Sequence, residues 1–111
     1  MSKGMRPFKT VWGDAVDISK TEKILLLFSH LDCVVEDDES RHNTAEVWIP
    51  ENEIDTVKDK IEKLLNDDRF RVLVNEFGFS FDDILAAKRV IENTPEDFIE
   101  EEGGVHILVD Y

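Results

Sequence analysis

The stretch VHILVDY, residues 105–111, closes the chain with a run in which apolar side chains dominate. Val105, Ile107, Leu108 and Val109 do not alternate with polar residues in the way that a half-exposed strand requires. A nearly continuous apolar strand is typical of a position inside a sheet rather than at its edge. The segment therefore predicts a fold in which a sheet lies at the centre and helices cover it.

Three further strands are expected upstream. CVVE (33–36) and AEVWIP (45–50) are rich in residues that favour strands, and the polar loop between them predicts an antiparallel pair with a charged tip. PFKTVWG (7–13) is expected to be a short strand that Gly13 ends. Residues 1–7 are expected to form a flexible tail.

The first helix is expected at KTEKILLLFSHL (20–31), after a capping box formed by Ser19 and Glu22. Its block 24–28 is apolar on every side, so this helix should be buried all round. A second helix should begin after Pro50, where acidic residues suit a helix N-terminus. Its apolar positions recur at helical spacing and are Ile54, Val57, Ile61, Leu64 and Leu65.

Residues 67–77 fit either a strand or a helix, and a helix that ends at Gly78 is the preferred interpretation. The next helix start is clearer. Ser80 with Asp83 forms a capping box, and Phe79 with Ile84 forms a hydrophobic staple, so a helix is predicted from Phe81 to about Glu92.

A last short helix is expected near residues 95–102, with Thr94 as its N-cap, Pro95 at its first position and Gly103 as its end. Together the elements predict an α+β domain. It should have a small mixed or antiparallel sheet of about four strands, with four to five short helices packed mainly on one side. The length of 111 residues fits a single domain over 1–111.

The letters EFGFS (76–80) are typical of the turn in a DNA-reading helix-turn-helix motif. In such a motif the first turn of the second helix meets bases and phosphates, and here Asp82 and Asp83 occupy that turn. Two carboxylates would be repelled by DNA. The same letters are explained by two packed helices joined by a capped turn, and this interpretation is preferred.

The net charge of −13 is the largest anomaly of the composition. Residues 72–111 hold two basic and ten acidic side chains, a net charge of −8, so the acidity accumulates toward the C-terminal half. Such a surface repels nucleic acid and anionic membranes and attracts cationic partners. Its simplest role would be to confer solubility.

No catalytic, cofactor-binding or metal-binding motif is present in the sequence. The three histidines are scattered without a metal-ligand spacing, and the single cysteine, Cys33, follows a helix end beside Asp32, where nothing favours the thiolate. The chain is therefore expected not to be an enzyme and to need no cofactor or metal ion.

No apolar run reaches the roughly 20 residues of a membrane span, and the start MSKGMRPFKT lacks the apolar core of a secretory signal. A cytoplasmic location is expected, and the oligomeric state stays open. In its size and charge the chain resembles bacterial immunity proteins, nuclease inhibitors and phage-encoded anti-host proteins.

The leading hypothesis is a non-catalytic immunity-type or inhibitor protein whose acidic groups cover the basic surface of a toxin or nuclease, without binding nucleic acid itself. Trp48 would be its anchor, because it shares a strand side with Glu46. The alternatives are a regulatory helix-turn-helix protein and a small enzyme with buried carboxylates. The partner-binding residues expected under the leading hypothesis are Glu36, Asp37, Asp38, Glu39, Trp48, Asp82, Asp83, Glu100, Glu101 and Glu102.

Overall fold

The computed structural model describes residues 4–7, 16–17, 21–37, 44–67, 72, 75–76, 78–79 and 81–110. Its strands are β1 (Gly4–Pro7), β2 (Val16–Asp17), β3 (Val34–Asp37), β4 (Thr44–Pro50) and β5 (Gly104–Asp110). Its helices are α1 (Thr21–His30), the 3-10 helix η1 (Glu51–Glu53), α2 (Ile54–Asn66), α4 (Phe81–Glu92) and α5 (Glu96–Glu102). The expected α+β class is confirmed.

The strands form one sheet in the order β2-β1-β5-β4-β3, and every neighbouring pair is antiparallel. The sheet thus has five strands among the described residues, where about four were expected. The predicted pairing of β3 with β4 is confirmed, with Val35 opposite Val47. The predicted interior position of the last strand is also confirmed, because β5 lies between β1 and β4.

The N-terminal segment departs from the expected flexible tail. Residues 4–7 form β1, which pairs with β5 on one side and with β2 on the other. The physical reason is that the second edge of β5 presents backbone N–H and C=O groups that another strand can pair, although GMRP has little strand propensity of its own. A strand was also expected at 7–13. Its first residue, Pro7, is the last residue of β1, and residues 8–13 lie outside the described part of the chain.

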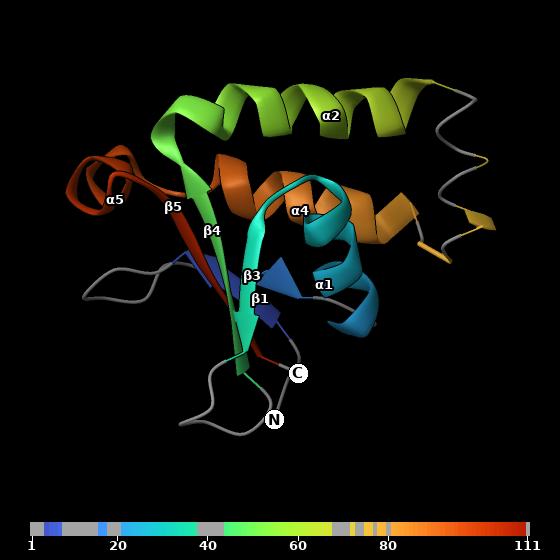
Figure 1. The fold of residues 1–111 in the computed structure, drawn as a ribbon, viewed down its shortest axis with the longest axis horizontal. Coiled ribbons are helices and arrows are strands. Elements are labelled where there is room, and N and C mark those ends of the chain that lie inside the picture. The colour runs from blue at the N-terminus through green and yellow to red at the C-terminus, as the bar shows by residue number, and fades with distance from the viewer. Residues whose placement is uncertain are drawn as a thin grey trace.

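The two faces of the sheet differ in what covers them. Figure 1 shows α1, α2 and α4 on one side of the sheet, with α5 reaching out beside β5. Alternate residues of β4 and β5 point toward α1, α2 and α4, and six of them are at most 1% exposed: Ala45, Val47, Ile49, Val105, Ile107 and Val109. The positions between them face the opposite side, which we call the outer face of the sheet.

Helix α1 is less deeply buried than its sequence predicts. Ile24, Leu27 and Phe28 are completely buried in the core, whereas Leu26 keeps 53% of its surface exposed. The expectation of a helix buried all round is therefore wrong on one side. A helix that lies in the outer layer of a two-layer domain has neighbours along only part of its circumference.

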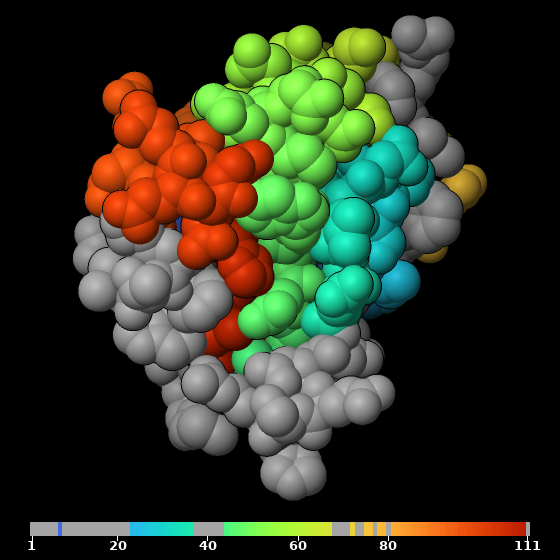
Figure 2. Space-filling model, turned by 60° about the vertical axis from the view of Figure 1, so that its left-hand side comes forward, coloured from blue at the N-terminus to red at the C-terminus, as the bar shows by residue number. Residues whose placement is uncertain are grey.

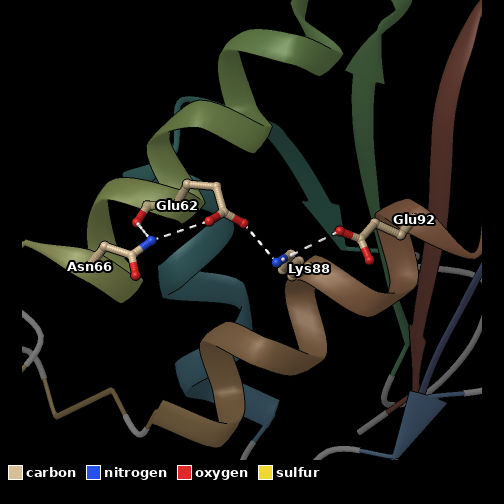
Figure 3. Close-up of polar contacts among 4 residues, drawn as sticks. All are labelled: Glu62, Asn66, Lys88 and Glu92. Atoms are coloured by element: carbon tan, nitrogen blue, oxygen red, sulfur yellow. Dashed lines mark hydrogen bonds and ion pairs between the residues drawn. The ribbon is translucent and has the colours of Figure 1, made fainter.

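Helices α2 and α4 pack against each other and are also joined by a polar cluster at their surface (Figure 3). Lys88 Nζ of α4 lies 2.7 Å from Glu62 Oε1 of α2 and 3.9 Å from Glu92 Oε1. The Asn66 side-chain amide donates to Glu62 Oε2 at 3.2 Å and to the Glu62 carbonyl oxygen at 2.9 Å. The neighbouring Lys88 lowers the pKa of Glu62, and Glu62 raises the pKa of Lys88.

All five predicted apolar positions of α2 are buried.

Gly78 and Thr94 lie at two predicted helix ends, and only Gly78 has the expected geometry. Gly78 has a positive φ of 75°, as expected of a residue that follows a helix. Val72, Asn75 and Glu76 are helical. The remainder of 68–77 and Ser80 lie outside the described residues. The N-cap role expected for Thr94 is wrong. Its hydroxyl donates to the Val90 carbonyl oxygen at 2.9 Å, so it satisfies the end of α4 instead.

Candidate functional site

The outer face of the sheet carries two rows of residues whose neighbours are fixed by the strand register. Trp48 of β4 lies between Val34 of β3 and His106 of β5. In the next row, Glu46 lies between Glu36 and Leu108. Directly opposite residues of antiparallel strands project from the same face with Cβ atoms about 5 Å apart. The register therefore brings a tryptophan, a histidine and two carboxylates from three separate segments into one patch.

This patch surrounds a hollow of about 280 Å³, which we call the Trp48 hollow. Figure 2 looks toward this side of the molecule, with β4 in green between β3 in cyan and α5 in orange. The hollow lies where α5 meets the outer face of the sheet. Six residues line it: Val34, Glu36, Glu46, Trp48, Glu102 and His106.

The wall formed by Glu102 depends on the connection between α5 and β5. Glu102 ends α5, Gly103 follows with a left-handed φ of 76°, and Gly104 begins β5. The Gly103 carbonyl oxygen accepts a hydrogen bond from the Glu51 backbone N–H at 3.0 Å, which holds this turn against η1. The end of α5 is thereby fixed beside the sheet, and its last carboxylate borders the hollow.

The electrostatics of the hollow are unbalanced. Glu36 and Glu46 are directly opposite each other, an arrangement of like charges that destabilises an antiparallel pair. His106 Nε2 lies 3.6 Å from Glu46 Oε2 and can offset that carboxylate only when the imidazole is protonated. The His106 ring meets the Trp48 ring edge to face, with centroids 6.0 Å apart and planes at 88°. Among the described residues that line the hollow, three are acidic and His106 alone can become cationic.

The structure brings only part of the expected partner-binding set together. Glu36, Trp48 and Glu102 line the hollow. Glu100 and Glu101 are exposed on the same short helix as Glu102, and Asp37 continues β3. Asp38 and Glu39 lie outside the described residues.

The two aspartates of α4 do not belong to this site. Both stand in the first turn of α4, which is one of the helices that cover the opposite face of the sheet (Figure 1). Asp82 is exposed, but Asp83 is only 2% exposed and engages other groups of the protein. Asp83 is therefore corrected from a surface contact to a buried side chain, because one side of the first turn of α4 faces the body of the domain while Asp82 on the other side stays exposed.

Besides Val34, two polar residues of the hollow were not chosen from the sequence as site residues, namely Glu46 and His106. Each has a signal in the sequence. Glu46 shares a strand side with Trp48, and His106 is the one polar side chain inside the apolar run 105–109. A polar residue that interrupts an apolar strand marks a face that meets water or a ligand. The missing information was the register that places residues 36, 46 and 106 together.

A second hollow, of about 270 Å³, lies where α1 ends against α2 and is bordered by His30, Asp32, Lys60, Lys63 and Leu64. Lys60 Nζ lies 2.6 Å from Asp32 Oδ2 and 3.5 Å from the Leu31 carbonyl oxygen. Its ammonium group lowers the pKa of Asp32. Cations near a helix C-terminus satisfy its last carbonyl groups and its dipole, so these contacts have a structural explanation.

Three further expectations concern the reactivity of Cys33, metal binding and membrane spans. Burial raises the pKa of the Cys33 thiol to about 12, which agrees with the prediction that nothing favours its thiolate. Within the described ranges, no three His, Cys, Asp or Glu side chains gather closely enough to hold a metal ion. None of the described helices combines the length and apolar character that crossing a membrane requires.

Comparison of the chain with protein-family models, with curated proteins and with solved structures finds no match.

Proposed function

We propose that this chain is a non-catalytic binding domain that docks a basic surface of another protein on the outer face of its sheet. The observation that carries the proposal is the convergence of Glu36, Glu46 and Glu102 around Trp48. These carboxylates come from β3, β4 and α5, so the fold, and not the local sequence, concentrates negative charge at an aromatic side chain.

The chemistry of this patch suits a protein interface. Tryptophan is enriched among the residues that contribute most binding energy, and a charged rim steers an oppositely charged partner toward it. Val34, with 49% of its surface exposed, adds an apolar contact next to Trp48. A net charge of −13 extends the attraction beyond the patch itself.

The partner that fits best is a toxin or nuclease whose basic, nucleic-acid-binding surface is covered in the complex. An inhibitor or immunity-type protein acting in the cytoplasm would need this combination of negative charge and an aromatic anchor, and it would need no catalytic group of its own. The helix-turn-helix alternative gains no support. The first turn of α4 exposes the carboxylate of Asp82, which the phosphates of DNA would repel.

The test is capture of the partner from host lysate by two matched variants of the tagged protein. The first reverses the charges of the site by Glu36→Lys, Glu46→Lys and Glu102→Lys. The second makes the same change in net charge at exposed positions on other elements, by Asp59→Lys, Glu76→Lys and Asp82→Lys.

We expect the wild-type protein and the second variant to retain one basic protein at low salt and the first variant to lose it. Association of the purified pair should slow as salt rises, because the attraction is screened. Equal loss of binding in both variants would contradict the proposal, since the net charge and not the outer face would then control binding.

A further inference from the structure

We propose that the Trp48 hollow receives one arginine side chain of the basic partner, with its guanidinium group between Trp48 and the carboxylates of Glu36 and Glu46. The inference rests on the proposed function and adds the chemical group that is recognised at its centre. Three properties of the hollow lead to it: its size, its paired carboxylates and its aromatic wall.

The size of the hollow suits a single side chain. Pockets that bind small molecules and cofactors typically enclose about 300–1,000 Å³ and bury most of the ligand. The Trp48 hollow measures about 280 Å³ and opens on the surface of the molecule. It is therefore better suited to bind a protruding side chain of a docked protein than to enclose a cofactor.

The carboxylates of Glu36 and Glu46 favour the binding of a cation. Glu36 and Glu46 are held opposite each other by the pairing of β3 with β4, so the stems of both side chains stay close together on the outer face. Their repulsion is a cost to the free protein. A positive group placed between them removes this repulsion and adds two attractions, and Glu102 contributes a third carboxylate from the side of α5.

The combination of groups favours guanidinium over ammonium. A guanidinium group is planar and presents five N–H donors, so it can bond to two carboxylates at once, whereas an ammonium group is a compact, strongly hydrated charge. Its flat face also stacks on aromatic rings. Trp48 is partly exposed and lines the hollow, so a planar cation that enters the hollow can contact the indole.

The test uses fluorescence of Trp48 in the Trp12→Phe variant, in which Trp48 is the remaining tryptophan of the two. The probes are blocked Gly/Ser peptides that carry three arginines, three lysines or three citrullines at the same positions. Citrulline keeps the shape of arginine and lacks its charge. We expect the arginine peptide to change Trp48 fluorescence and to bind about five-fold more tightly than the lysine peptide, while the citrulline peptide does not bind.

Two further variants locate the preference. Glu46→Gln should abolish the preference for arginine over lysine. Glu100→Gln removes a carboxylate from the exposed surface of α5, which does not line the hollow, and should weaken both peptides equally. Thermal unfolding serves as the folding control, because removal of one of two opposed charges should leave Glu46→Gln at least as stable as the parent protein.

The outcomes separate the two proposals. Equal, salt-sensitive binding of the arginine and lysine peptides, unaffected by Glu46→Gln, would overturn the arginine site and leave docking of a basic partner intact. Failure of every cationic peptide to bind at low salt would overturn the arginine site and remove the support for an acidic docking face as well.

Discussion

At the scale of single residues, the two glycines between α5 and β5 have different roles. A Cβ atom on Gly104 would clash with the Ile49 carbonyl oxygen and lie 3.0 Å from the Glu51 nitrogen, whereas a Cβ atom on Gly103 would meet nothing within 4 Å. Gly103 is needed instead for its φ of 76°, which favours glycine and tolerates asparagine.

This difference predicts how each position responds to substitution. Gly104→Ala should lower the free energy of unfolding by about 1–3 kcal/mol, because backbone atoms of the strand pair must move apart. Gly103→Ala should cost about 1–2 kcal/mol through backbone strain, and Gly103→Asn should recover part of that loss. A fourth variant, Gly104→Asn, completes the set. Urea unfolding of the four variants measures the change in the free energy of unfolding at each position. Recovery by asparagine at position 104 would contradict the steric explanation.

At the scale of elements, α1 contains neighbouring leucines in opposite environments. Leu27 is completely buried in the core, and Leu26 is 53% exposed. Leu27→Ala should therefore lower the free energy of unfolding by about 2–5 kcal/mol through lost burial and an internal cavity, while Leu26→Ala should change it by less than about 0.5 kcal/mol. Denaturant unfolding of both variants provides the comparison. Similar losses would mean that α1 is covered on both sides, as its sequence alone predicts.

The polar cluster between α2 and α4 predicts a pH dependence. Lys88 lowers the pKa of Glu62 below its ordinary value of 4.5, so this interaction stabilises the folded state above that pH and is lost as the pH falls through the lowered pKa. Lys88→Met should thus lower the melting temperature slightly at neutral pH and have no effect in strong acid. The effect is small because the pair is exposed to solvent.

The control for this prediction is Arg89→Met, which removes the same charge from the next position of α4. Melting curves of both variants and of the parent protein across the acidic range would measure the difference. A destabilisation by Lys88→Met that persists unchanged well below pH 4.5 would show that packing of the lysine stem, and not its charge, joins the two helices.

At the scale of the whole molecule, self-repulsion is the dominant electrostatic feature. A net charge of −13 is carried by a chain with a radius of gyration of 13.2 Å. At about 0.01 M salt the screening length is about 30 Å, so charges repel across the entire molecule, whereas at about 0.3 M they are largely screened beyond their near neighbours. The melting temperature should therefore rise by several degrees over this range of NaCl.

Part of that rise should come from the outer face of the sheet. The variant with Glu36→Gln, Glu46→Gln and Glu102→Gln should melt at a higher temperature at low salt and respond less to added NaCl. Scanning calorimetry at both salt concentrations tests this. A salt response identical to that of the parent protein would show that the three carboxylates do not repel one another appreciably.

The local sequence determined much of the secondary structure. Helical spacing of apolar residues predicted α2, the capping and staple residues predicted the start of α4, and β-favouring runs around a polar loop predicted the pairing of β3 with β4. The apolar run at 105–109 predicted the interior position of β5. These features succeed because each depends on residues that are close together in the chain.

The tertiary structure alone decided which strand completes the sheet and which carboxylates meet. Gly4–Pro7 forms a strand because β5 offers it an edge, although its own residues have little strand propensity. Glu36, Glu46, Glu102 and His106 are brought together by strand register and by the turn after α5, while Asp83 is buried by helix packing. A register shift of one residue would reverse every side chain of a strand to the other face, so composition and charge could show that the protein is acidic, but only pairing could assemble the site.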